Sequence, residues 1–223
     1  MSDTTIPDLL AELDDAHAAI DSRFKAMMEA DDRALYGMDL LVAGALNRTR
    51  ANLKAFDQLI KDRNLVIAGA LLRLQIDSAL RVSAAFLVED PHDFSFRVLR
   101  GERIDLMTDR NGKRLSDRSL VKSLSDEYDW LERVYERTSG YIHLSGTHIH
   151  HSIENIQEDG RFQVKVSDID QDLPEDLYVE IIQAFAESIH ILLKYVDGWI
   201  DTKNNPEEVA KIKEAILAQH ENS

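Results

Sequence analysis

The segment that decides the fold runs from residue 64 to residue 89 and reads NLVIAGALLRLQIDSALRVSAAFLVE. Alanine, leucine and other apolar residues occupy nearly all of its helical faces, which is typical of a central helix covered by neighbours on every side. Three charged residues, Arg73, Asp77 and Arg81, interrupt the segment, and Pro91 follows its end. Because a buried helix of this length needs other helices around it, the segment predicts a helical bundle.

Helical periodicity continues on both sides of this segment. The low counts of glycine (9) and proline (4) also favour helices over a turn-rich β fold. We therefore predict a mainly α, single-domain bundle that spans residues 1–223 and has about six or seven helices. The other helices are expected within residues 7–30, 31–62, 94–103, 116–140, 174–200 and 206–219.

Two segments depart from the helical pattern. Residues 105–117 contain Asn-Gly and several bases, so we expect a basic, mobile loop there. Between residues 147 and 168, the apolar residues Phe162, Val164 and Val166 alternate with polar ones after the turn signal Asp159-Gly160. This alternation predicts a β-hairpin at about 147–168.

The composition restricts the classes of function. The formal net charge of −15 opposes non-specific attraction to nucleic acid or anionic lipid, and the absence of cysteine excludes disulfides and thiolate metal sites. The amino terminus lacks the pattern of a secretory signal, and charges interrupt the longest apolar segment. We expect a cytoplasmic protein with no membrane span.

Bases and acids are unevenly distributed along the chain. Residues 97–122 carry eight bases against four acids, whereas the whole chain is acidic. Such a segment is either an anion-binding rim or a surface that docks on the acidic helices of the same protein.

Arg73, Asp77 and Arg81 follow one another at intervals of four residues on the most apolar helix. Residues with this spacing share a helix face, so the three side chains can form linked ion pairs. Because an unpaired buried charge is costly, the line of charges needs partners. In a structural interpretation, the three residues form a polar seam that locks the bundle or a dimer interface. In a functional interpretation, Arg73 faces a cleft and binds an anion.

The stretch YERTSGYIHLSGTHIHH, residues 135–151, contains four of the eight histidines. Within it, Arg137 and His143 have five residues between them. An arginine that stabilises a pentacoordinate phosphate and a histidine that moves a proton are a sufficient minimal set for metal-free RNA cleavage, which needs no cofactor.

This segment resembles the HEPN superfamily, all-helical domains in which an arginine is followed four to six residues later by a histidine. The resemblance implies a metal-independent endoribonuclease or RNA-binding protein in a toxin or phage-defence setting. It also implies a homodimer that brings Arg137 and His143 together. In addition, ALLRLQIDSALR (70–81) and YERTSGYIH (135–143) are similar to segments of bacterial helical families that combine an arginine, an acid and a Tyr…Ser…His helix.

Helix geometry sets a condition on this site. Six steps of about 100° leave Arg137 and His143 roughly 120° apart on a regular helix, so the two converge only if Gly140 distorts the helix. Ser139 shares the His143 face more naturally, which would suit a buried, hydrogen-bonded histidine instead.

Two further hypotheses come from other classes of function. His148 and His150 would point to one side of a strand, and His143 or His151 would complete a metal site. Alternatively, the apolar helices and the lack of a specific motif indicate a non-enzymatic oligomeric protein that acts through a protein partner.

Overall fold

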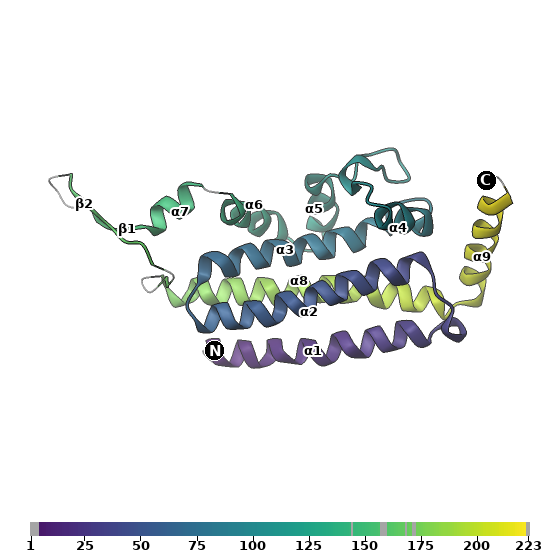
Figure 1. Cartoon of the computed structure of the whole chain (residues 1–223), viewed down its shortest axis with the longest axis horizontal. Coiled ribbons are helices and arrows are strands. Elements are labelled where there is room, and N and C mark those ends of the chain that lie inside the picture. Colours follow the sequence, from purple (N-terminus) through teal and green to yellow (C-terminus); the bar gives the residue numbers. More distant parts are fainter. Residues whose placement is uncertain (1–4, 144, 157–159, 168, 171–172, 222–223) are drawn as a thin grey trace.

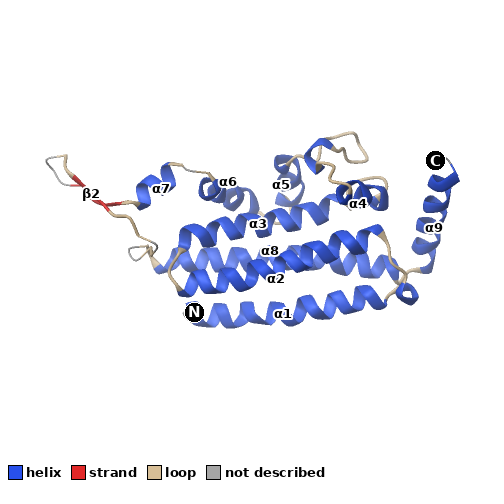
Figure 2. Cartoon of the chain, viewed as in Figure 1, coloured by secondary structure: helices blue, strands red, loops and turns tan. Residues whose placement is uncertain are grey.

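The computed structural model describes residues 5–143, 145–156, 160–167, 169–170 and 173–221. The protein is mainly α-helical, with one two-stranded antiparallel sheet in this part of the chain (Figures 1 and 2). The long helices are α1 (Ile6–Glu29), α2 (Gly37–Lys61), α3 (Leu65–Ala84) and α8 (Glu175–Lys203), and the shorter elements are α4 (Pro91–Leu99), α5 (Asp117–Ser125), α6 (Leu131–Ile142), α7 (Gly146–His151), β1 (Ile153–Ile156), β2 (Phe162–Val164) and α9 (Pro206–Glu221).

The helices begin at residues whose side chains satisfy free backbone N–H groups. Thr5 and Asp8 form a reciprocal capping box at the start of α1, and Asn64 accepts a hydrogen bond from the N–H of Ile67 at the start of α3. Ser116 accepts one from the N–H of Ser119 at the start of α5. These local signals explain why the helix starts can be read from the sequence.

The four long helices run side by side, α5 and α6 lie over α3 on the side away from α1, and α4 packs against α2 (Figure 1). The core lies between α8 and its neighbours, where the rings of Phe56 and Phe185 stack with centroids 3.9 Å apart. The prediction of a mainly α bundle is confirmed. No helix among the described residues is both long enough and apolar enough to span a bilayer.

Several helix boundaries differ from those expected: the helix expected over residues 94–103 is α4, Pro91–Leu99, and the central helix ends at Ala84 rather than near residue 89. The helix predicted over residues 116–140 is divided into α5 and α6, because Tyr128 and Trp130 in the connection between them turn inward and pack against the core. The helix predicted from residue 31 begins at Gly37. The residues before it form a separate turn, Asp31–Arg33, whose φ angles of 48°, 50° and 66° lie in the left-handed region.

The hairpin is present but shorter than predicted. Ile153 pairs with Val164 and Ile156 pairs with Phe162 in an antiparallel register. Residues 146–151 form the helix α7 instead of a strand, so the expected strand at His148 and His150 is wrong. Backbone bonds such as that from the N–H of Ser152 to the carbonyl of Ile149 continue the helical turn up to the start of β1. In Figure 1, α7 and the hairpin extend away from the bundle.

A buried ion pair closes the opposite end of the bundle. The ammonium group of Lys203 lies 3.1 Å from the Asp39 carboxylate, and neither side chain has any exposed surface. Lys203 also donates to the carbonyls of Met27 (2.8 Å) and Ala34 (3.0 Å), at the end of α1 and in the turn that follows. Asp39 accepts a further bond from Nε1 of Trp199 at 2.8 Å. The pair therefore fastens α1, α2 and α8 together.

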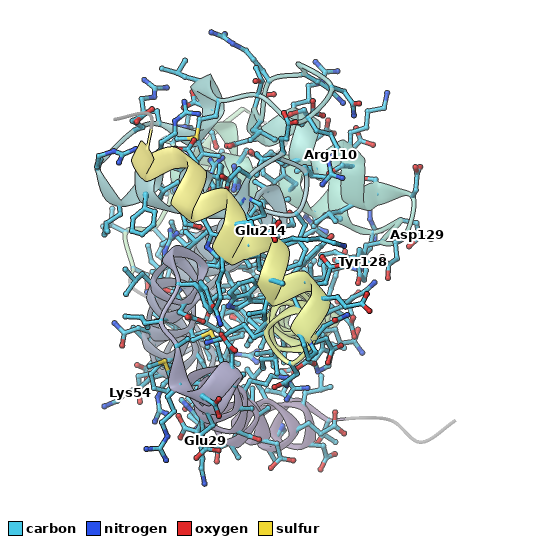
Figure 3. The ribbon with its side chains drawn as sticks, turned by 90° about the vertical axis from the view of Figure 1, so that its right-hand side faces the viewer. Glu29, Lys54, Arg110, Tyr128, Asp129 and Glu214 are labelled. Carbon is cyan, nitrogen blue, oxygen red and sulfur yellow. The ribbon has the colours of Figure 1, made fainter. Side chains whose placement is uncertain are left out.

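The last helix, α9, lies across this end of the bundle (Figure 3). Glu29, at the end of α1, and Arg110, in the loop after α4, mark opposite sides of that end in the view. Val209 of α9 is buried, and Lys213 of α9 contacts Asp31 at 3.1 Å. The C-terminal helix expected over residues 206–219 thus holds the strained turn after α1.

Candidate functional site

A connected polar cluster lies on α3 and includes the three charges singled out from the sequence. We call it the arginine seam. Its members are Arg48 of α2, Arg73, Asp77 and Arg81 of α3, Asp117 at the start of α5 and Tyr135 of α6.

Each carboxylate of the arginine seam bridges two guanidinium groups. Asp77 lies 3.0 Å from Arg48 and 3.1 Å from Arg81. Asp117 is paired with Arg81 and lies 3.3 Å from Arg73. The chain of ion pairs thus ties α2 and α5 to α3, which is the role predicted for a polar seam.

Arg73 and Tyr135 form one of the contacts between α3 and α6. The guanidinium carbon of Arg73 lies 3.6 Å from the centroid of the Tyr135 ring, an arrangement that gives a favourable cation–π interaction. Nη2 of Arg73 donates to the Tyr135 hydroxyl, which in turn donates to Asp117 at 2.9 Å. The two segments that carry the resemblance, 70–81 and 135–143, therefore lie against each other.

The seam fixes the protonation of its members. Burial works to raise the pKa of Asp117, but the charge of Arg81 and the hydrogen bonds from Tyr135 and Arg81 outweigh it, so this pKa lies below its ordinary value of 3.8. Burial and the hydrogen bond to Asp117 raise the pKa of Tyr135 to about 12. At neutral pH, Tyr135 is therefore a donor and Asp117 an acceptor.

The exposed fraction of the arginine side chains differs along the arginine seam. The side chain of Arg73 is only 13% exposed, whereas that of Arg48 is 40% exposed. The guanidinium group that a ligand can reach most easily is therefore that of Arg48, which the sequence did not single out.

Arg137 and His143 both lie at the surface near the end of α6. Nη1 of Arg137 donates to Glu180 of α8 at 2.8 Å, and Arg133 approaches the same carboxylate at 3.7 Å. His143 is exposed and is the first residue after the helix. It is therefore not the buried histidine that was weighed as an alternative.

The distortion expected at Gly140 does not occur. α6 continues through Gly140 to Ile142, so successive residues keep a regular helical rotation up to that point. Gly140 therefore introduces no bend that would turn His143 towards Arg137, and His143 itself follows the helix end with an extended backbone. Ser139, in the same helix, donates to the carbonyl of Tyr135 at 2.8 Å.

The alternative metal site relied on a strand. His148 and His150 belong to α7, and residues two apart on a helix do not share a face. Nδ1 of His148 accepts a hydrogen bond from the N–H of Ser145 at 3.3 Å, while the side chains of His150 and His151 lie outside the described atoms. Among the described residues, no group of three or more potential metal ligands is found.

Internal bonds occupy a large part of the basic segment 97–122. Arg97 pairs with Glu102 at 2.9 Å and Arg103 with Asp105 at 2.6 Å. Arg110 donates to carbonyls that follow α3, including that of Phe86 at 2.6 Å, and so anchors the basic loop 105–117. The segment also contains bases without a side-chain partner among the described residues, which are Arg100, Lys113, Arg114, Arg118 and Lys122.

Sequence reasoning missed three parts of the arginine seam and the buried ion pair. Arg48, Asp117 and Tyr135 were not assigned to the seam. Their contacts with α3 join positions 29 to 62 residues apart, which no local pattern encodes. The signal available in the sequence was the row of charged residues on an apolar helix, because buried charges need partners.

The chain matches no model of a protein family, and no curated protein or solved structure matches it either.

Proposed function

We propose that this protein is a HEPN-like RNA-binding protein that cleaves RNA without a metal ion, through active sites formed between two copies of the chain. The observation that supports the proposal is the accessibility of both motif residues at the end of α6. The side chain of Arg137 is 49% exposed, and His143 is exposed beyond the helix end.

The two-copy requirement follows from the regular helix. Because α6 is continuous through Gly140, an active pair within one chain would need a bend that is absent. A twofold dimer would place Arg137 of one subunit near His143 of the other, and it would supply two arginines and two histidines to one region.

The chemistry needs only these groups. One His143 removes the proton of a ribose 2′-hydroxyl while the 2′-oxygen attacks the adjacent phosphorus. Arg137 stabilises the charge on the non-bridging oxygens of the pentacoordinate phosphate. The bond from phosphorus to the 5′-oxygen then breaks, and the same His143, now protonated, returns its proton to that oxygen, directly or through a water. The products are a 2′,3′-cyclic phosphate and a 5′-hydroxyl.

Glu180 is expected to position the arginine. It accepts from Nη1 of Arg137, which leaves the other N–H groups of that guanidinium without a partner among the described residues. Arg133 on the same helix adds positive charge beside it. These local cations are expected to offset the net charge of −15 for a phosphate that approaches α6.

The test is cleavage of single-stranded RNA in the presence of a chelator. Replacing His143 by Ala or Arg137 by Ala is expected to lower the rate by about 100-fold or more. Two matched controls should keep the wild-type rate: Arg50→Ala, which removes a partly exposed arginine of α2 that pairs with Asp21, and His190→Ala, which removes an exposed histidine of α8.

Mixing the two inactive variants tests the shared site. A mixed dimer has one site with both native residues, so activity is expected to return when the Arg137→Ala and His143→Ala proteins are combined. Wild-type protein that leaves RNA intact contradicts the proposal, as does equal cleavage by wild type and His143→Ala. Cleavage that mixing fails to restore contradicts the two-copy site alone.

A second candidate, a non-enzymatic oligomeric protein, is favoured by apolar side chains on the outer face of α3. Ile67 and Leu74 lie seven residues apart, share a face of the helix and are 48% and 36% exposed. Light scattering on wild type and on Leu74→Glu tests this candidate. A dimer that the substitution dissociates, with no RNA cleavage by wild type, favours the interaction protein over the nuclease.

A further inference from the structure

A groove between α2, α3 and α4 combines an apolar wall with two guanidinium groups. Its volume is about 370 Å³, which lies within the range of small-molecule sites. We call it the α2–α4 groove. The residues that define it for the following argument are Leu40 and Arg48 of α2, Arg81 and Val82 of α3, and Val98 and Leu99 of α4.

The apolar part of the groove is incompletely covered. Leu40 is 42% exposed and Leu99 is 65% exposed, although both line the groove. Val82 forms part of its buried wall. A hydrocarbon or aromatic group in the groove would remove this apolar surface from water, which is favourable.

Few hydrogen-bond donors in the groove are available to a ligand. The hydroxyl of Ser78 donates to the carbonyl of Leu74 at 3.0 Å, and that of Ser95 donates to the carbonyl of Pro91 at 2.7 Å. Both serines are thus bound to their own helices. The guanidinium groups of Arg48 and Arg81 are therefore the donors left for a ligand.

Each of these guanidinium groups has N–H groups without a partner. Arg48 donates through Nη1 to Asp77, while its Nε and Nη2 have no hydrogen-bond partner in the part of the chain that the structure describes. Nη1 of Arg81 is buried and likewise lacks a partner among the described atoms. Because a buried donor without an acceptor costs free energy, this end of the groove favours an acceptor-rich group.

The charge balance of the arginine seam points to a single negative charge. Three arginines face two aspartates, Asp77 and Asp117, so one positive charge is left over. Asp105 lies close enough for Arg81 to lower its pKa, but Arg103, the principal cause of that lowered pKa, already pairs with it. One carboxylate would match this excess, whereas a cation would add to it.

We propose that the α2–α4 groove binds a small amphipathic monocarboxylate, with its carboxylate at Arg48 and its apolar part along Leu40 and Leu99. The proposal is independent of RNA cleavage, because it uses neither Arg137 nor His143. Guanidinium and carboxylate form charge-assisted hydrogen bonds, which fix the orientation of the ligand, and the apolar wall accepts a chain or ring.

Isothermal titration calorimetry with decanoate, below the concentration at which it forms micelles, tests the proposal. Wild type is expected to bind decanoate with at least about tenfold higher affinity than decanol, because the alcohol lacks the charge. Decylammonium is expected not to bind. Failure of decanoate to bind, or equal affinity for decanoate and decanol, would overturn the proposal.

Two variants locate the site. Arg48→Gln is expected to weaken binding of decanoate by about tenfold, since one charge-assisted contact is lost. Gly44→Leu places a side chain in the groove, where a Cβ at Gly44 meets nothing within 4 Å, and is expected to abolish binding without unfolding the helix.

The matched control is Arg50→Gln on the same helix. Arg50 pairs with Asp21 of α1 and does not line the groove, so its replacement should leave the affinity unchanged. Circular dichroism melting establishes that each variant is folded. Unchanged binding by folded Arg48→Gln and Gly44→Leu would place decanoate elsewhere and refute the site. A wild-type dimer that Gly44→Leu dissociates, without decanoate binding, would assign the groove to a second copy of the chain instead.

Discussion

Gly69 of α3 lies directly against the ring of Tyr141 on α6, so that a Cβ at position 69 would be only 2.5 Å from Cδ2 of the tyrosine. This close approach seats α6, with Arg137, on the central helix. It explains why a glycine is present in the interior of the most apolar helix, where glycine is otherwise unfavourable.

We predict that Gly69→Ala destabilises the protein by about 1–3 kcal/mol, because the added methyl group forces α3 and α6 apart. The control is Gly44→Ala, also within a helix, where a Cβ meets nothing within 4 Å. This change should stabilise the protein by about 0.5–1 kcal/mol. Urea unfolding measures both values, and equal effects of the two substitutions would contradict the close contact.

Tyr135→Phe removes the hydroxyl of Tyr135 and keeps its ring, so it measures what the hydroxyl contributes to stability. The phenyl ring still stacks on Arg73, but Asp117 loses one hydrogen bond, so we expect a loss of about 1 kcal/mol in the free energy of unfolding. Tyr195→Phe is the control, because the hydroxyl of Tyr195 has no hydrogen-bond partner among the described residues. Denaturant titration of both variants should show a cost only for Tyr135.

Replacing Asp39 and replacing Lys203 are expected to cost different amounts of stability, although both break the same buried pair. Asp39→Ala leaves a buried ammonium group without its counter-charge and should cost about 3–5 kcal/mol. Lys203→Met should cost less, because methionine fills most of the lysine volume, whereas Asp39→Ala also leaves Nε1 of Trp199 and the N–H of Tyr36 without their acceptor. Trp199 fluorescence during unfolding reports both changes, and a larger cost for Lys203→Met would contradict this account.

A surface ion pair on α8 serves as the control for that measurement. Asp197 pairs with Arg23 at 3.0 Å, but its side chain is 47% exposed. Because solvent screens such pairs, Asp197→Ala should change stability by at most about 1 kcal/mol.

Asp117 is expected to make the protein sensitive to strong acid. Its pKa is lowered in the folded state, so its contribution is fully present above the ordinary value of 3.8 and is lost as the pH falls below 3.8 through the folded pKa. The stability difference between wild type and Asp117→Asn should therefore be constant from about pH 5 to pH 7 and shrink below about pH 4. A constant difference down to about pH 2 would contradict the lowered pKa.

His92 is expected to make the stability of the protein depend on pH closer to neutrality. The ring is buried against Tyr36 and Trp199, both of its nitrogens lack a partner among the described atoms, and burial lowers its pKa below the ordinary 6.5. Because the unfolded chain binds the proton more readily, stability should fall as the pH drops below 6.5. His92→Phe keeps the aromatic packing and should remove this dependence in thermal melts recorded between about pH 7 and pH 5.

The sequence by itself determined the helical class and most helix starts. The apolar faces of residues 64–89 and the capping residues Asn64 and Ser116 act within a few positions of themselves, so their effects can be read locally. The spacing of Arg73, Asp77 and Arg81 likewise indicated linked ion pairs, of which that between Asp77 and Arg81 is present.

Only the tertiary structure decided the partners of these charges and the directions of the surface residues. Arg48, Asp117 and Tyr135 reach α3 from three other helices, and Asp39 and Lys203 meet across 164 residues of chain. Whether residues 146–151 form a strand or a helix was not decided by their alternating histidines, and the chain folds them as α7. The physical reason is that ion pairing and burial depend on distances between helices, and these distances are set by packing of the whole bundle rather than by any one segment.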